Sequence, residues 1–147
     1  MPEPSQGKLL LVEDNPDDEA LMLRAIKKSN IREEVVVARD GAEAVQYLHK
    51  ASASEDAKDC LPRVIFLDLK LPRLDGLEVL RLIRSHPATR LLPVVILTTS
   101  GQEEDLYKSY VLGASSFVRK PISYTELIKV ASHLVTYWLT INQVPLA

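Results

Sequence analysis

Five polar side chains that could do chemistry lie at the ends of four apolar segments of this 147-residue sequence. Glu13 and Asp14 come directly after the run KLLLV, and Asp68 comes after RVIFL. Thr98 closes the run PVVIL, and Lys120 follows SSFVR. If these runs are parallel strands, their carboxyl ends share one edge of a sheet, where ligand sites form. The sequence therefore predicts that three carboxylates, a hydroxyl and an ammonium group meet at one site.

The residue types at this site indicate phosphoryl transfer assisted by a divalent cation. Carboxylates gathered together repel one another, and burial raises their pKa values further. A hard cation with oxygen ligands relieves this cost, and Mg²⁺ suits a small carboxylate-lined site. Mg²⁺ also gathers phosphate oxygens, so that one carboxylate can act as the nucleophile. Lys120 would then offer a positive charge to the phosphoryl group, and Thr98 a hydroxyl hydrogen bond.

Each of these residues also has an ordinary structural explanation when it is taken singly. An aspartate at a strand end is usually a helix cap or a solvated side chain. A lysine before a proline is usually exposed, and an acidic pair after an apolar run is common by chance. The placement of all five side chains at strand ends is what favours a shared site.

Apolar runs and amphipathic stretches alternate five times along the chain. The predicted strands are residues 8–13, 34–38, 63–68, 93–98 and 115–118, and the predicted helices are residues 16–29, 42–51, 77–85, 103–112 and 123–140. Unbroken Val, Ile and Leu runs are typical of parallel strands with helices on both faces. We therefore predict an α/β fold with a doubly wound, five-stranded parallel sheet. The polar residues 52–62 are predicted to form a surface loop.

Length and composition predict one cytoplasmic domain at residues 8–140, with a flexible N-terminus at 1–7 and a tail at 141–147. The net charge is −2 with acids and bases scattered along the chain, which predicts binding neither to nucleic acid nor to a membrane. No apolar run approaches the roughly 20 residues that span a bilayer. Cys60 is the only cysteine, so no intrachain disulfide is possible and a reducing compartment fits.

Residues 8–140 resemble the receiver domain of bacterial response regulators. The matching positions are, in order, the acidic pair Glu13-Asp14, the phospho-acceptor Asp68 within FLDLKLPRLDG, the hydroxyl residue Thr98, the switch aromatic Phe117 and the pair Lys120-Pro121. This resemblance implies a flavodoxin-like (βα)5 fold and a protein that is switched by phosphorylation. It implies a phosphoryl acceptor with at most weak self-dephosphorylation, and not an enzyme.

The resemblance also implies a role for each residue of the site. Asp68 would accept the phosphoryl group, with Lys120 and Thr98 as its catalytic partners. Mg²⁺ would be bound directly by Asp14, by Asp68 and by the backbone carbonyl of Lys70, and through a water molecule by Glu13.

Two further features follow from the same resemblance. Thr98 and Phe117 would form the switch that reports phosphorylation to the surface. The Lys120–Pro121 peptide bond would be cis, an isomer that only about 5% of X–Pro bonds in folded proteins adopt.

A narrower resemblance concerns the partners of the protein. The segments LLVEDNPDDEALMLRAIKKSN and LTTSGQEEDLYKSYVLGASSFVRKP, with the terminal YWL, are similar to the single-domain regulators that pair with bacterial and cyanobacterial phytochromes. This implies a histidine kinase of the phytochrome type as the phosphoryl donor. A kinase without a photoreceptor, or a phosphorelay, is the alternative.

The last predicted helix suggests how the signal leaves the domain. About seven residues follow this helix, so we expect no output domain and a signal carried by protein contacts. One apolar stripe of the helix would seal the core, at Leu127, Val130, Ala131 and Leu134. A second stripe, with Tyr137 and Trp138 nearby, would face a partner, at Ile128, Val135 and Leu139. We therefore predict a homodimer formed by the fourth helix, the fifth strand and the fifth helix.

Three other classes of protein fit the sequence less well. A flavodoxin-type nucleotide- or flavin-binding protein needs a Ser/Thr/Gly loop after the first strand, whereas EDNPDD repels anions. A haloacid dehalogenase-type hydrolase has a second aspartate where this sequence has Lys70. A receiver that serves only as a scaffold is disfavoured because every chemical residue is present.

Overall fold

The computed structural model describes residues 7–145, apart from the side chains of residues 58 and 59, so most of the predicted flexible segment at 1–7 lies outside the described residues. The chain folds into one sheet of five parallel strands in the order β2-β1-β3-β4-β5. The strands are β1 (Lys8–Val12), β2 (Glu34–Ala38), β3 (Pro62–Leu67), β4 (Val94–Thr98) and β5 (Ser116–Arg119). The predicted doubly wound parallel sheet is thereby confirmed.

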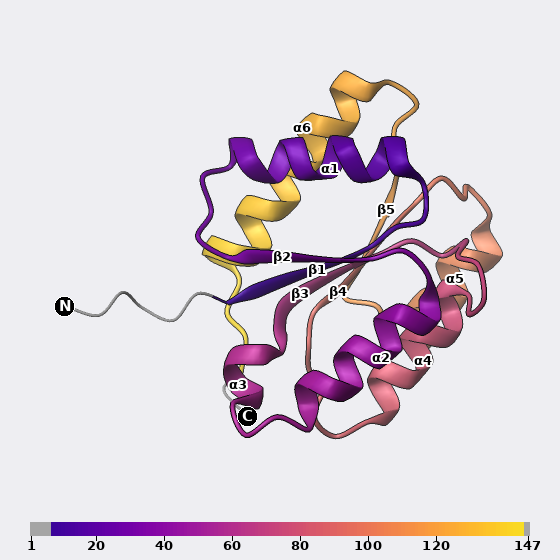
Figure 1. The fold of residues 1–147 in the computed structure, drawn as a ribbon. Helices are drawn as coiled ribbons and strands as arrows, with labels where there is room; N and C mark the ends of the chain where they lie inside the picture. Colours follow the sequence, from indigo (N-terminus) through magenta and orange to yellow (C-terminus); the bar gives the residue numbers. More distant parts are fainter. Residues whose placement is uncertain (1–6, 146–147) are drawn as a thin grey trace.

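The helices form a layer on each face of the sheet (Figure 1). They are α1 (Pro16–Lys28), α2 (Gly41–Ser52), α3 (Ala57–Cys60), α4 (Gly76–Ser85), α5 (Glu103–Val111) and α6 (Tyr124–Thr136), and α6 continues as the π-helix η1 (Tyr137–Ile141). Helices α1 and α6 lie together on one face, whereas α2, α4 and α5 lie on the other. Two details differ from the prediction. The predicted loop at 52–62 contains the short helix α3, and the last helix ends at Ile141, one residue inside the predicted tail.

Side-chain caps fix where four of the helices begin at the edge of the sheet that carries the polar residues. The Asn15 side chain accepts hydrogen bonds from the backbone amides of Asp17 and Asp18, at 2.9 and 3.1 Å, and Pro16 takes the first helical position. Asp40 caps α2, Asp75 caps α4 and Ser123 caps α6 in the same manner. Each helix therefore starts at a defined residue close to the strand ends.

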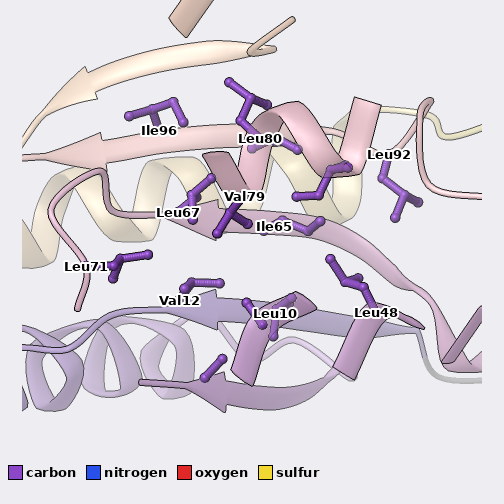
Figure 2. Packing of buried hydrophobic residues seen from close by; sticks show 14 of the residues in the cluster. Leu10, Val12, Leu48, Ile65, Leu67, Leu71, Val79, Leu80, Leu92 and Ile96 are labelled. Carbon is purple, nitrogen blue, oxygen red and sulfur yellow. The ribbon is translucent and has the colours of Figure 1, made fainter. Parts of the chain in front are cut away.

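The apolar core is divided by the sheet into two layers. The layer between the sheet and helices α2 and α4 is shown in Figure 2, where Ile65 and Leu67 of β3 meet Val79 and Leu80 of α4. The opposite layer joins β1 and β3 to α1 and α6 through Met22, Phe66 and Ala131, among others. None of the helices in the described part of the chain is long and apolar enough to cross a membrane.

The predicted partner-facing stripe of the last helix is wrong in one respect. Val135 and Leu139 are 0% and 3% exposed, and they pack in the core layer beneath α1 and α6. The buried line of this helix repeats every four residues at Leu127, Ala131, Val135 and Leu139. Apolar side chains surround most of the helix, so periodicity alone did not fix which line faces the sheet.

Candidate functional site

The register of the sheet brings the predicted site residues to one edge. Strands β1 and β3 are neighbours with Val12 opposite Leu67, so that Glu13 and Asp68 leave the sheet side by side. The backbone amide of Asp68 donates to the carbonyl of Val12 at 3.1 Å, which extends the ladder to the site. Lys120 follows the end of β5, the outer strand of the sheet, which pairs with β4.

Lys120 lies at the centre of this group of side chains. Its Nζ atom donates to both carboxylate oxygens of Glu13, at 3.0 and 2.9 Å, and to Oδ2 of Asp68 at 2.9 Å. A further contact of 2.9 Å joins it to Oδ2 of Asp18 in the first turn of α1. The Lys120 side chain is only 3% exposed, so these ion pairs are screened little by solvent.

Burial and crowding leave the site short of positive charge. Burial of the Glu13 carboxylate and its repulsion by Asp68 raise the pKa of Glu13 to about 8, although Lys120 acts in the opposite direction. Burial lowers the pKa of Lys120, but attraction to Asp68 and Glu13 and the bonds to Asp18 outweigh it, so the pKa is raised overall. Lys120 is therefore charged near neutral pH, and one ammonium does not balance the surrounding carboxylates.

The three predicted acids are placed so that they fit a divalent cation. One carboxylate oxygen from each of Glu13, Asp14 and Asp68 lies within 4.8 Å of the other two. Glu13 and Asp68 are buried, whereas Asp14 is exposed at the mouth of the site. An all-oxygen donor set suits a hard cation such as Mg²⁺ or Ca²⁺. Lys70 adjoins the cluster, because its backbone amide donates to Oδ1 of Asp68 at 3.3 Å.

The loop after β3 is held in place by a glycine. The backbone amide of Gly76 donates to the carbonyl of Leu69 at 2.8 Å, and a Cβ atom at position 76 would overlap the Asp68 carbonyl oxygen. Asp75 in turn caps helix α4 by accepting from the Glu78 amide at 3.1 Å. The Asp75-Gly76 pair of the motif therefore fixes the backbone that carries Asp68.

Thr98 ends β4, and Phe117 lies on the neighbouring strand β5. Thr98 is fully buried, and its hydroxyl accepts a hydrogen bond of 3.4 Å from the Ser100 amide. The Ser100 hydroxyl donates to Asp105 in the first turn of α5, at 2.5 Å. Phe117 is half-buried opposite Ile96 of β4. The link from Thr98 through Ser100 to α5 was not predicted.

The sequence interpretation missed Asp18 and misjudged Pro121. Asp18 looked like a helix-start acid, and no motif marks it as a partner of Lys120. The predicted cis Lys120–Pro121 bond is wrong, since no peptide bond in residues 7–145 is cis. The trans isomer is favoured by about 0.5–1 kcal/mol in X–Pro bonds, and Lys120 reaches its carboxylates without the cis turn.

The fold and the arrangement of these side chains are those of a receiver domain. A family model for the response regulator receiver domain matches residues 9–132, and the chain belongs to this family. It is a phosphoryl acceptor of two-component signalling.

Among relatives of known sequence, Rcp1 of Synechocystis is 36% identical over 139 residues, which cover 95% of this chain and 93% of Rcp1. The probable methanogenesis regulatory protein FilR2 of Methanothrix harundinacea is 37% identical, with 93% of this chain and 86% of FilR2 covered.

Solved structures show the same likeness. The phosphorylated cyanobacterial phytochrome response regulator RcpA has a TM-score of 0.87 and 38% identity, with 96% of this chain and 99% of RcpA covered. Rcp1 in its Mn²⁺-bound form has a TM-score of 0.86 and 35% identity, with 95% and 99% covered. A divalent ion is therefore known in a relative, and the acidic cluster of this chain has ligands that fit one.

We predict that ionisation of Glu13 destabilises the metal-free protein as the pH rises. The pKa of Glu13 in the folded protein, about 8, lies above its ordinary value of 4.5. The folded state therefore keeps a proton that the unfolded state has released. The resulting stabilisation is complete below pH 4.5 and is lost as the pH rises through about 8.

Urea unfolding in the presence of a chelator, between about pH 5 and pH 9, measures this effect. Glu13→Gln should flatten the fall of the unfolding free energy across that window. Asp17→Asn, which removes an exposed carboxylate nearby, should keep the slope of the wild-type protein. An equal slope in Glu13→Gln and the wild-type protein would contradict the prediction.

Proposed function

We propose that Asp68 accepts a phosphoryl group from a histidine kinase and that phosphorylation changes the contacts of this protein with other proteins. The observation that supports this proposal is the position of Asp68. Its carboxylate is paired with the buried ammonium of Lys120 at 2.9 Å and lies beside the acids Glu13 and Asp14. A carboxylate with a cation and further acids at one edge has the partners that an attack on phosphorus requires.

The reaction uses the carboxylate oxygen of Asp68 as the nucleophile. This oxygen forms a bond to phosphorus as the bond from phosphorus to the donor breaks, and the leaving imidazole of a phosphohistidine keeps the electron pair and takes a proton. The ammonium of Lys120 donates to the phosphoryl oxygens and stabilises their charge. The hydroxyl of Thr98 donates to the same group from the end of β4. We propose no catalytic turnover beyond slow self-dephosphorylation.

We propose Mg²⁺ as the cation of the acidic cluster. The side chains of Asp14 and Asp68 would hold it directly with the backbone carbonyl of Lys70, and Glu13 would act through a water molecule. When it is bound, the ion supplies positive charge to carboxylates and phosphoryl oxygens that would otherwise repel each other. Its supporting observation is the set of three carboxylate oxygens within 4.8 Å of one another.

We further propose that Thr98 and Phe117 report phosphorylation. A new dianion at Asp68 draws the Thr98 hydroxyl toward it, which vacates space for the Phe117 ring. The same movement disturbs the 3.4 Å bond from the Ser100 amide to Thr98, and Ser100 holds Asp105 at the start of α5. A few kcal/mol of differential interaction is enough to shift such a two-state equilibrium.

The proposed contact surface is a homodimer face on α5, β5 and α6, which are the fourth helix, the fifth strand and the fifth helix of the sequence prediction. Its apolar residues are not those of the buried α6 stripe but three exposed side chains of α5, which are Tyr107, Tyr110 and Val111 at 72%, 51% and 66% exposure. Ile122 and Tyr124 are exposed at the junction of β5 and α6. A two-fold axis uses one such patch twice, and aromatic side chains are the usual anchors of an interface.

We propose that the phosphoryl donor is a phytochrome-type histidine kinase. We also propose that this protein acts in the cytoplasm. The support is the likeness to RcpA, which is a phytochrome response regulator, across 96% of this chain. The second candidate is a histidine kinase without a photoreceptor. FilR2, a probable methanogenesis regulator with 37% identity, favours this second candidate.

Phosphorylation at Asp68 predicts that Asp68→Asn will not be labelled. Acetyl phosphate with Mg²⁺ should add about one phosphoryl group per chain to the wild-type protein, through a bond that is stable in acid and labile in base. Asp68→Asn should gain none, because the amide of Asn lacks the nucleophilic oxygen. Asp17→Asn, which changes an exposed carboxylate in the first turn of α1, is the matched control and should be labelled. Intact-protein mass spectrometry gives the readout. Full labelling of Asp68→Asn would refute the assignment.

If the donor is a kinase of the phytochrome type, phosphoryl transfer to this protein should depend on light. Phosphotransfer from each purified histidine kinase of the source organism, with and without red and far-red light, ranks the donors by their initial rate. A photoreceptor kinase should transfer at least about tenfold faster than the others, a preference that corresponds to about 1.4 kcal/mol. Faster transfer from a kinase that does not respond to light would select the second candidate instead.

The homodimer face predicts that Val111→Glu shifts the protein toward the monomer, because a buried unpaired charge opposes association. Sedimentation at tens of micromolar measures the change. Ile141→Glu, at a residue 63% exposed in η1, is the control that should leave the dimer intact, whereas Val135→Glu should unfold the domain. Thr98→Ala should remove any effect of phosphorylation on the equilibrium. A wild-type monomer in both phosphorylation states would disprove the dimer.

A further inference from the structure

Asp18 is a carboxylate partner of Lys120 that the proposed chemistry leaves without a role. It lies in the first turn of α1, whereas the other partners of Lys120 follow the strands β1 and β3. Its Oδ2 atom is 2.9 Å from the Nζ atom of Lys120, and its side chain is 17% exposed. Asp18 is not part of the group of acids whose oxygens lie within 4.8 Å of one another.

The three N–H bonds of the Lys120 ammonium are fully used in this structure. Four carboxylate oxygens, two from Glu13 and one each from Asp18 and Asp68, lie 2.9–3.0 Å from Nζ. An ammonium group has three donors and no acceptor. Glu13 therefore shares one donor between its two oxygens, and each aspartate takes one of the others.

Phosphorylation and metal binding change two of these three partners. Transfer to Asp68 turns one carboxylate oxygen into a bridging oxygen and removes the negative charge of that carboxylate. A cation at Glu13, Asp14 and Asp68 competes with the ammonium for the Glu13 carboxylate. Asp18 lies outside the cation cluster and is not the residue that is phosphorylated. It is therefore the carboxylate partner that Lys120 retains through the reaction.

The backbone around Asp18 is held firmly enough for this role. Its amide donates to the Asn15 side chain at 3.1 Å, as part of the cap that starts α1. The neighbouring Glu19 forms two hydrogen bonds of 3.0 Å with Arg39, which follows β2. Helix α1 also packs along α6 in the core layer. The carboxylate therefore reaches Lys120 from a rigid support.

We propose that Asp18 is a positioning residue for Lys120. It holds one N–H group of the ammonium from the α1 side, so that the lysine stays extended across the edge of the sheet and directs its remaining N–H groups at the phosphoryl group on Asp68. This role rests on the proposed function, since it acts on the same phosphoryl transfer. Asp18 does not touch the phosphoryl group and is not a catalytic residue.

The test compares Asp18→Ala with Asp17→Ala in the full chain. Asp17 adjoins Asp18 in the same helical turn and is exposed, so both variants remove one acid from the start of α1. Only Asp18→Ala removes a contact with Lys120. The initial rate of labelling by acetyl phosphate with Mg²⁺ should fall about tenfold in Asp18→Ala, as expected for the loss of one charge-assisted hydrogen bond. The rate should stay within about twofold in Asp17→Ala.

Two further measurements separate positioning from a general loss of structure. Asp18→Asn keeps an oxygen acceptor without the charge, and it should recover part of the lost rate. The ¹⁵N resonance of the Lys120 ammonium is observable when buried ion pairs slow the exchange of its protons with water. This resonance should broaden in Asp18→Ala and persist in Asp17→Ala. Binding of Mg²⁺ to the folded protein should raise its melting temperature by mass action, and this rise should persist in both variants because the acids of the cation cluster are intact.

The outcomes distinguish the inference from the function on which it rests. If the wild-type protein is not labelled at Asp68, the proposed function is wrong. If it is labelled and Asp18→Ala reacts as fast as Asp17→Ala, the positioning role is wrong. Faster labelling of Asp18→Ala would also overturn it, because Asp18 would then compete with the phosphoryl group for Lys120.

Discussion

An ammonium group buried to 3% exposure needs partners, and the carboxylates at the strand ends of this protein need a cation. The desolvation of one unpaired ion costs several kcal/mol, so neither side of the pair is stable in the interior without the other. Contacts of 2.9–3.0 Å from Lys120 to Glu13, Asp18 and Asp68 satisfy both requirements at once. They also tie β1, β3, β5 and α1 together at one edge, so the conformation of the whole site depends on this ion cluster.

The strand order explains why a long side chain is needed at position 120. The connection from β2 to β3 passes β1, so that β1 and β3 are neighbours in the sheet. This brings Glu13 and Asp68 together in the middle of the sheet. Lys120 starts from β5 at the sheet margin and must pass over β4 to reach them. Its long side chain spans that distance, and its Nζ atom reaches Glu13 and Asp68 at 2.9–3.0 Å. Topology, rather than closeness in sequence, assembles the site.

Much of this arrangement follows from the sequence. Runs such as VIFL and VVIL are buried on both faces, and strand ends in a parallel sheet share an edge, which places Glu13, Asp68 and Lys120 together. The phase of α6 was not predictable in this way. Its apolar residues cover most of its circumference, and packing against α1 decides that Val135 faces inward.

Other features depend on geometry that no pattern encodes. Asp18 has the sequence signature of a helix-start acid, and its contact with Lys120 arises from where the Asn15 cap places the first turn of α1. The Ser100 bond to Asp105 likewise depends on how the loop after β4 returns to α5. Such side-chain contacts between loops are set by local backbone direction, which composition and periodicity do not determine.

The imbalance of charge at the site is also what makes it responsive. Glu13, Asp18 and Asp68 contact one ammonium and Asp14 lies beside Glu13 and Asp68, and both burial and repulsion by Asp68 raise the pKa of Glu13. A site whose charges were already neutralised would gain little from a cation. A divalent ion held by these acids would relieve the repulsion, and a phosphoryl dianion would then find the ion and Lys120 in place. Because the ammonium has only three N–H groups, every new acceptor must displace an old one. Phosphorylation at Asp68, as proposed, would redistribute hydrogen bonds among β1, β3, β5 and α1, and this would give a local charge change a path to distant elements of the fold.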